Sequence, residues 1–276
     1  MDDNCLRIST FMIISQLTRY PIKSCKGIPC TSAQVERRGF QLDRRWMVTS
    51  EDGLLMTQRK VPKMALISVV IGPDHLAVNA PGMPELLVPF DPPNSDVLQV
   101  QVWDDVVPAL HVGTAPSSWF SRFLGIPAKL VMMPETTHRP VNPRYAVAQD
   151  EVSFADAYPY LLLSEASLED LNSRLESPLP MNRFRPNLVV KGCEPYEEDQ
   201  WRVIQVGKIT FHVVKPCDRC VLTTVDQDTG IKGEEPLRTL STYRTRDNNV
   251  YFGQNLIAAN TGTVTVGDRV EVLEWR

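Results

Sequence analysis

The stretch Leu66-Ile67-Ser68-Val69-Val70-Ile71-Gly72-Pro73-Asp74-His75-Leu76-Ala77-Val78 is the clearest sign of architecture in this chain of 276 residues. Two short apolar runs, at 66–71 and 75–78, flank the sequence Gly72-Pro73-Asp74. Valine and isoleucine favour strands, and glycine beside proline favours a turn. The stretch therefore predicts two short β-strands with a tight connection between them.

The same pattern of short runs and turn residues extends outward in both directions. Through the first hundred residues the turn signals recur about every 8–12 residues, a spacing typical of a sandwich or barrel. The 22 prolines, against 14 glycines, also favour short strands and stiff connections over long helices. Further strands are expected at 13–20, 45–48, 86–90, 97–103, 188–190, 202–206, 208–214 and 262–273, with Gly267-Asp268 in the last run as a bend, a bulge or a hairpin turn.

Only two helices are predicted. One begins after Thr114, and the other begins at Ser164, a residue type that favours helix N-caps. Between them, the polar and proline-broken segment 134–143 is the best candidate for a linker. We therefore predict a mainly β (α+β) fold with a few helices, divided into domains at 1–133 and 134–276.

Composition excludes several classes of protein. The formal net charge of −4 and the isoelectric point of about 5.7 leave no overall basic field for nucleic acid. No run approaches the ~20 apolar residues of a membrane span, and Met1 to Cys5 lack the basic start of a signal peptide. The six cysteines are too few and too scattered for a disulfide scaffold. We expect a cytoplasmic protein with reduced thiols.

The densest candidate for chemistry is the segment 215–226, which contains Cys217, Arg219 and Cys220. Cysteine is a nucleophile or metal ligand as the thiolate, which nearby basic side chains favour. Three interpretations compete: two small buried cysteines, a redox dithiol and a zinc site. A redox dithiol should open a helix, but a strand-like run precedes this one, and a zinc site lacks a second ligand pair in the sequence. A transition metal held mainly by a cofactor would need only one cysteine.

Basic residues form a second group of candidates. Lys23-Ser24 follows a proline turn, Arg44 precedes a strand-like run, and Arg185 lies between Phe184 and Pro186. Each alone is most simply a solvated surface charge, although arginine offers a planar fork of donors that fits a phosphate. The histidines show no ligand spacing, and neither a phosphate-cradling glycine loop nor a Gly-x-Ser-x-Gly motif is present. The acidic segment 194–199 is most simply a solvated loop, although it could also dock a partner, and the sequence does not separate the two.

Five motifs occur in a consistent order between about residue 12 and residue 275. They are Tyr20-Pro21-Ile22-Lys23-Ser24-Cys25-Lys26-Gly27, Asp43-Arg44-Arg45-Trp46, Ser164-Glu165-Ala166-Ser167-Leu168, Phe184-Arg185-Pro186-Asn187 and Cys217-Asp218-Arg219-Cys220-Val221-Leu222-Thr223-Thr224-Val225-Asp226. Together they resemble the MOSC-domain molybdenum enzymes, and within that family the branch of YcbX and the amidoxime-reducing components. The resemblance implies an N-terminal MOSC β-barrel domain and a MOSC β-barrel domain, with molybdopterin bound between them.

The resemblance also implies a set of site residues. In that family the second cysteine of the Cys-x-Arg-Cys motif ligates molybdenum, which points to Cys220 as the metal ligand and catalytic residue. The implied cofactor contacts are Lys23, Ser24, Arg44, Asp156, Arg185, Asn187, Asp218 and Arg219. Amidoxime-reducing members carry Thr-Ser where this sequence has Ala157-Tyr158, and Ser at the position of Asp218, so backbone groups would replace those side-chain contacts here.

The implied reaction is the reduction of small N-hydroxylated compounds, such as purine bases and amidoximes, to amines with a molybdenum cofactor (Mo-molybdopterin). In balance, R–NH–OH with two electrons and two protons gives R–NH₂ and water. YcbX-like members often continue into a ferredoxin domain, but the sequence has no Cys-x₄-Cys-x₂-Cys run. A separate electron-donor protein, such as a flavin reductase or ferredoxin, is therefore expected. Two alternatives stay open: a non-catalytic carrier of molybdenum cofactor or its sulfur, and a β-barrel binding protein with structural cysteines.

Overall fold

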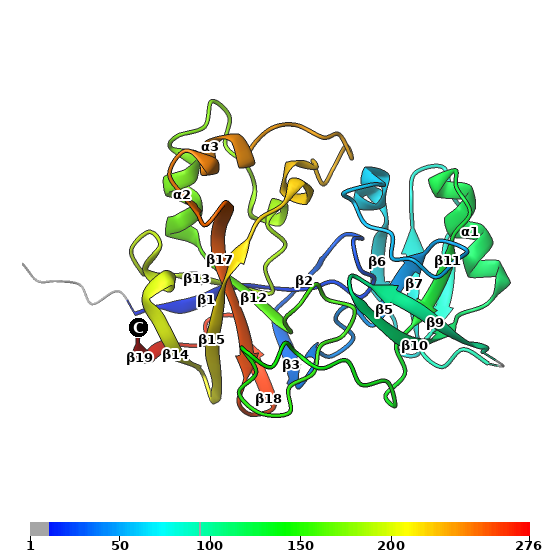
Figure 1. Ribbon diagram of the computed structural model, residues 1–276, viewed down its shortest axis with the longest axis horizontal. Coiled ribbons are helices and arrows are strands. Elements are labelled where there is room, and N and C mark those ends of the chain that lie inside the picture. The colour runs from blue at the N-terminus through cyan, green and yellow to red at the C-terminus, as the bar shows by residue number, and fades with distance from the viewer. Residues whose placement is uncertain (1–10, 94) are drawn as a thin grey trace, which may run out of the picture.

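The computed structural model of the chain describes residues 11–93 and 95–276 and confirms the mainly β architecture. Met1 to Cys5, on which the signal-peptide argument rests, lie outside the described residues. Figure 1 shows two lobes side by side. The strands between residues 46 and 132 gather in the smaller lobe, whereas the second half of the chain and its first strand build the larger one.

The larger lobe is a closed barrel. Its strands are β1 (Ile13–Arg19), β2 (Ile28–Cys30), β12 (Tyr160–Ser164), β13 (Leu188–Lys191), β14 (Trp201–Val206), β15 (Ile209–Asp218), β16 (Thr245–Arg246), β17 (Asn249–Ala258) and β19 (Val270–Trp275). They form one nine-stranded sheet in the order β19-β14-β15-β17-β12-β13-β1-β2, with β16 paired to β17. The sheet closes because the backbone N–H of Val270 donates to the carbonyl of Met12, and that of Ile14 donates to the carbonyl of Asp268.

The smaller lobe contains two antiparallel sheets. One comprises β5 (Trp46–Thr49), β9 (Val97–Val102), β10 (Asp105–His111) and β11 (Lys129–Met132), and the other β6 (Ser68–Ile71), β7 (His75–Asn79) and β8 (Leu86–Pro89). The strand pair predicted at 66–78 is confirmed, because Ile71 pairs with Leu76 across the turn. A third small sheet, at the base of the barrel, consists of β3 (Ser32–Glu36), β4 (Gly39–Phe40) and β18 (Gly262–Thr265).

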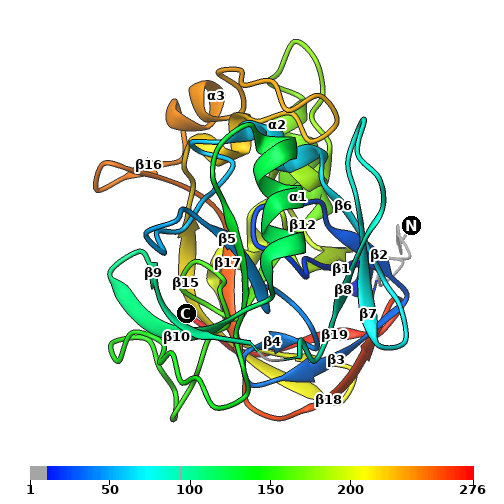
Figure 2. The same ribbon diagram turned by 90° about the vertical axis from the view of Figure 1, so that its right-hand side faces the viewer.

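Both predicted helices are present, as α1 (Thr114–Leu124) and α2 (Glu165–Asn172). Ser164 caps α2 as expected, since its hydroxyl accepts a hydrogen bond from the backbone N–H of Ser167 at 3.1 Å. Figure 2 shows α1 in the smaller lobe, where it packs against β11. The short helix α3 (Leu237–Ser241) was not predicted. Among the described helices, none combines the length and the apolar composition that a membrane crossing requires.

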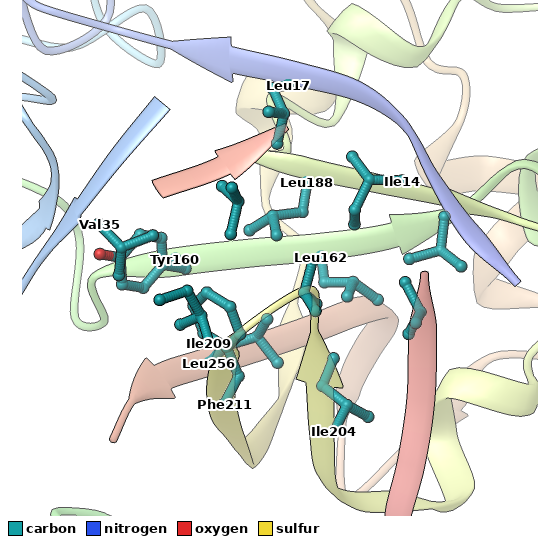
Figure 3. Close-up of a cluster of buried hydrophobic side chains, with 14 of the residues drawn as sticks. Ile14, Leu17, Val35, Tyr160, Leu162, Leu188, Ile204, Ile209, Phe211 and Leu256 are labelled. Atoms are coloured by element: carbon teal, nitrogen blue, oxygen red, sulfur yellow. The ribbon is translucent and has the colours of Figure 1, made fainter. Parts of the chain in front are cut away.

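The barrel encloses a large hydrophobic core of its own (Figure 3). In β15, the alternate residues Ile209, Phe211 and Val213 are buried, as the period of two in a strand dictates. Leu17 from the first strand and Leu162 from β12 lie in the same cluster. Residues far apart in the sequence thus hold the barrel closed, and the loops at its rim acquire fixed positions.

The structure answers one question that the sequence left open, the conformation at Gly267-Asp268. The residues Gly267-Asp268 form a bend and not a hairpin turn, because β18 pairs with β3 whereas β19 pairs with β14. The segment 134–143 contains no helix or strand, as expected of a linker. The domain boundary at 133/134 stays a prediction.

The interpretation of segment 194–199 as a solvated loop holds for the exposed Glu194 but is wrong for Glu198. The Glu198 side chain is fully buried, and its carboxylate accepts hydrogen bonds from the hydroxyls of Ser164 at 2.9 Å and Ser167 at 2.8 Å. Burial raises the pKa of Glu198, and these hydrogen bonds offset part of that effect. Glu198 therefore braces the start of α2 from inside the protein.

Candidate functional site

A cavity of about 760 Å³, including its part open to solvent, lies where loops of the barrel meet loops of the smaller lobe. Its wall contains every residue that the sequence assigns to the site: Lys23, Ser24, Arg44, Asp156, Arg185, Asn187, Asp218, Arg219 and Cys220. The structure thus brings together side chains that lie almost 200 positions apart, from Lys23 to Cys220. The role of each toward a cofactor stays a prediction.

Three of these residues adopt left-handed backbone conformations. The φ angles are 65° at Ser24, 51° at Arg44 and 56° at Arg185. Residues other than glycine rarely adopt positive φ, and such strain concentrates at functional sites because the surrounding structure must enforce it. Each of the three lies in a different loop at the cavity wall, so the local strain converges on one place.

Positive charge exceeds negative charge at the cavity wall. Its wall carries five cationic side chains, those of Lys23, Arg44, Arg59, Arg185 and Arg219, and two carboxylates, Asp156 and Asp218. Arg185 is only 7% exposed, and no described residue accepts a hydrogen bond from its guanidinium. The Nε atoms of Arg59 and Arg219 are buried without an acceptor in the described part of the chain. Buried donors without acceptors are costly, so an anion such as a phosphate fits this wall.

Asn187 lines the cavity, but its amide is engaged inside the protein. Its Oδ1 atom accepts from Arg44 Nη1 at 3.0 Å and from the backbone N–H of Leu161 at 3.3 Å, while Nδ2 donates to the carbonyl of Thr18 at 3.1 Å. The amide therefore ties β1 to β12 and orients Arg44. This arrangement favours a positioning role for Asn187 over direct contact with a cofactor.

Lys23 and Asp156 form an ion pair at the cavity wall. The Lys23 ammonium is almost fully buried and lies 2.5 Å from Asp156 Oδ1, which also accepts from the indole N–H of Trp103 at 3.2 Å. Burial lowers the pKa of Lys23 to about 8, although Asp156 counteracts part of this shift. Desolvation raises the pKa of Asp156, but Lys23 and Arg59 outweigh it and hold that pKa well below its usual value. At neutral pH both groups are therefore charged.

The two cysteines of the 215–226 segment have different surroundings. Cys217 lies within β15, and its sulfur accepts a hydrogen bond from Arg219 Nη1 at 2.9 Å. Burial raises the pKa of Cys217, although the nearby guanidinium of Arg219 lowers it. Burial therefore opposes thiolate formation at this residue. Cys220 follows the strand at the start of a short 3₁₀ turn (Val221–Thr224), and its carbonyl accepts from the hydroxyl of Thr223 at 3.0 Å.

This geometry separates the interpretations of the cysteine pair. Cys217 lies near the end of a strand and Cys220 precedes a single 3₁₀ turn, so the pair does not open an α-helix as a thioredoxin-like dithiol does. Across residues 11–93 and 95–276, no cluster of three histidine, cysteine or acidic side chains could hold a metal on its own. A metal at Cys220 would therefore take its other ligands from a cofactor.

Two further side chains at or beside the cavity were not assigned to the site from the sequence. Arg59 lines the cavity, and its guanidinium lies 4.3 Å from the centre of the Trp103 ring. Arg139, inside the expected linker, is 3% exposed and donates to the carbonyls of Ser153 (2.9 Å), Ala155 (2.6 Å) and Asp156 (3.0 Å). It shapes the loop that carries Asp156. A basic residue in a proline-broken polar segment gives no sequence signal for burial.

A pair of buried glutamines fastens the Ser24 loop to the segment that follows Cys220. Gln58 Nε2 donates to Gln227 Oε1 at 3.1 Å, and Gln227 Nε2 donates back to Gln58 Oε1 at 2.9 Å. Gln58 Nε2 also donates to the carbonyl of Ser24 at 2.7 Å. The two lobes are thus joined beside the cavity by reciprocal amide hydrogen bonds.

We expect Gln58→Leu and Gln227→Leu each to lower the free energy of unfolding by about 1–3 kcal/mol, because each leaves a buried amide without its partner. The double variant should lose less than the sum, by about 1 kcal/mol or more, since no orphaned amide remains. Urea unfolding of the four proteins measures this coupling, and Gln99→Leu at an exposed position is the matched control. Strictly additive losses would show that the two amides act independently.

Comparison with known proteins is consistent with this architecture. The family model of the MOSC N-terminal beta barrel domain matches residues 11–127, and that of the MOSC domain matches residues 149–271. Mitochondrial amidoxime-reducing component 1 of Mus musculus is 39% identical over 97% of this chain and 84% of its own length. Mitochondrial amidoxime-reducing component 1 of Homo sapiens is 37% identical over 94% of this chain and 82% of its own length. The chain therefore belongs to the MOSC-domain family that includes the mitochondrial amidoxime-reducing components.

Proposed function

We propose that this protein is a molybdenum-cofactor reductase that converts N-hydroxylated compounds to amines. The observation that carries the proposal is the cavity wall, where buried cationic donors without acceptors surround an accessible cysteine. The phosphate of molybdopterin needs cationic donors, and molybdenum needs a soft ligand such as a cysteine sulfur. The relatives' names supply the reaction, since they describe reduction of amidoximes.

The residues present divide the work of holding such a cofactor. Arg185, Arg59 and Arg219 carry guanidinium groups for a phosphate, and Lys23 adds a point charge. Cys220 supplies the protein thiolate, and Arg44, oriented by its hydrogen bond to Asn187, lines the same cavity. When bound, the molybdenum cofactor supplies two-electron redox chemistry and a Lewis-acid centre for the N–O oxygen.

The remaining wall controls what reaches the site. Leu161 adds an apolar side chain to the cavity wall, while Tyr158 occupies part of the wall with a large side chain. Arg219 Nη2 donates to the carbonyl of Phe184 at 2.7 Å, so the charged and apolar parts of the wall are held together. We propose that small, flat N-hydroxylated bases and amidoximes fit this opening better than bulky ones.

Two further proposals concern the cellular context. We propose a separate electron-donor protein, a flavin reductase or ferredoxin or similar, because the described residues hold no second redox centre of clustered cysteines. The cytoplasmic location expected from the sequence stays a proposal, and the matching relatives are named as mitochondrial proteins.

The direct test is to purify the protein from a host that makes the cofactor and from one that does not. We expect about one molybdenum and one pterin per chain from the first host, and reduction of N-hydroxyadenine or benzamidoxime with reduced viologen as electron donor. The protein from the second host should contain neither molybdenum nor pterin and should not reduce these substrates. Bound molybdenum without turnover would favour the carrier function, and no molybdenum in either sample would overturn the proposal.

A pH dependence follows from Lys23. Its ammonium is protonated below a pKa of about 8, so its charge is present at pH 7 and is lost as pH rises through 8. The charged groups that act on its pKa are Asp156, which raises it, and Arg139 and Arg44, which lower it. We expect sulfate, which does not titrate in this range, to bind the cofactor-free protein about tenfold more weakly at pH 9.5 than at pH 7. Calorimetric titration measures this. Lys23→Arg, which keeps its charge, should remove the decline, and an equal decline in that variant would assign the effect to another group.

A further inference from the structure

The ring of Tyr20 lies against two of the arginines at the cavity wall. The guanidinium carbon of Arg44 is 4.5 Å from the ring centre, and that of Arg185 is 4.3 Å from it. Tyr20 itself is buried and does not line the cavity. Two guanidinium groups of like charge repel each other, but the negative face of an aromatic ring attracts both.

The Tyr20 ring contacts the Arg185 guanidinium, which lacks the hydrogen-bond partners that Arg44 has. Arg44 is also held by Asp43 and by Asn187 Oδ1 at 3.0 Å, whereas no described residue accepts a hydrogen bond from the Arg185 guanidinium. Arg185 is nonetheless 7% exposed and adopts a strained backbone with φ 56°. Because its guanidinium donates no hydrogen bond to a described residue, the cation–π contact with the Tyr20 ring helps to keep the Arg185 side chain in place.

The rest of the protein fixes Tyr20 rigidly. Its hydroxyl donates to the carbonyl of Pro186, next to Arg185, at 3.1 Å, and its backbone N–H donates to Asp43 Oδ1 at 2.6 Å. Its carbonyl accepts from the backbone N–H of Arg44 at 2.7 Å. Tyr20 therefore forms hydrogen bonds with Asp43 and Pro186, the sequence neighbours of the two arginines, and its ring contacts both guanidinium groups.

Gly27 makes room for the ring. A Cβ atom at residue 27 would lie 2.5 Å from Cε1 of Tyr20 and 2.5 Å from Cγ2 of Thr18, which is far inside van der Waals contact. The first and last residues of the motif from Tyr20 to Gly27 thus meet in space. The absence of a side chain at Gly27 leaves the space that the Tyr20 ring occupies.

We propose that Tyr20 is a positioning residue that holds Arg44 and Arg185 together as one anion-binding unit. The unit would take a phosphate or a similar oxyanion. This inference deepens the proposed function and rests on it for the identity of the natural ligand, but the anion-binding unit itself is a property of the chain alone.

Sulfate binding to the cofactor-free protein tests the inference, with the affinity measured by calorimetry and the melting temperature measured in parallel. Tyr20→Phe keeps the ring and should stay within about twofold of the unsubstituted affinity. Tyr20→Leu removes both ring contacts and should bind sulfate about tenfold more weakly, which corresponds to about 1.4 kcal/mol. Gly27→Ala, which displaces the ring without removing it, should weaken binding severalfold and serves as the second variant if Tyr20→Leu does not fold.

The control separates positioning from mere stability. Phe120→Leu removes a buried ring from α1, where no guanidinium of the described residues stacks on it, and should lower the melting temperature without changing sulfate affinity. If Tyr20→Leu or Gly27→Ala behaves in the same way, Tyr20 is only a core residue and the inference is wrong. Absence of sulfate binding in the unsubstituted protein would overturn it too. Neither result touches the proposed function, which molybdenum content tests independently.

Discussion

Replacing Cys220 with serine is expected to abolish the reduction of N-hydroxylated substrates, with a loss of more than about a hundredfold. Changes in groups that only support a metal ligand already cost 10–100-fold, and a serine hydroxyl is a hard, weakly acidic substitute for a soft thiolate. The variant should fold normally, because the backbone carbonyl and not the sulfur of Cys220 makes the hydrogen bond to Thr223. Steady-state rates with reduced viologen, normalised to pterin content, measure the loss.

Cys217→Ser is the matched control for that variant. The Cys217 sulfur accepts from Arg219 at 2.9 Å, and a serine hydroxyl can accept the same hydrogen bond. We therefore expect Cys217→Ser to keep its molybdenum and to lose less than about tenfold in rate. Equal and complete loss in both variants, without metal in either, would show instead that the two cysteines act as a redox dithiol.

Replacing Arg139 with methionine should produce the largest loss of stability. Its guanidinium is 3% exposed and donates to three carbonyls of the 153–156 loop and, at 2.7 Å, to Asp105 Oδ2. Methionine fills similar volume but leaves these acceptors without donors, so the free energy of unfolding should fall by about 3 kcal/mol. Urea unfolding monitored by tryptophan fluorescence measures this loss, and the cofactor content should fall with it because Asp156 is displaced.

Two comparisons make the Arg139 result interpretable. Arg139→Lys keeps the charge opposite Asp105 but not the fork of donors, so its stability should fall between those of the methionine variant and the unsubstituted protein. Arg174→Met removes an arginine that is paired with Asp170 on the surface of α2, and should change stability only slightly. A loss at Arg139 no larger than the loss at Arg174 would contradict the role of Arg139 in holding the loop.

Local patterns predicted the fold well where local chemistry determines structure. The strand pair around Gly72-Pro73-Asp74 and the helix that begins after Ser164 follow from turn and capping residues that act within a few positions. The helix α3 is five residues long and was missed, since so short a helix depends on its tertiary contacts with β17. The bend at Gly267-Asp268 was undecided for a similar reason, because the two flanking strands find partners in different sheets.

The site shows the same division. The residue types of Lys23, Arg185 and Cys220 indicated chemistry, but no spacing between them shows that they meet, and only the resemblance to a family predicted their convergence. Closure of the barrel brings their loops together. Arg139 and Glu198 carry charges that sequence reasoning assigns to solvent, and they were misjudged because burial of a charge depends on partners distant in the sequence.

The central claim is that molybdenum is bound to the sulfur of Cys220 in this cavity. X-ray absorption at the molybdenum edge, on protein produced with the cofactor, tests it most directly by counting sulfur neighbours. The account predicts one sulfur fewer per molybdenum in Cys220→Ser than in the unsubstituted protein, with the count unchanged in Cys217→Ser. The same sulfur count in all three proteins, or a loss at Cys217 instead of Cys220, would contradict it.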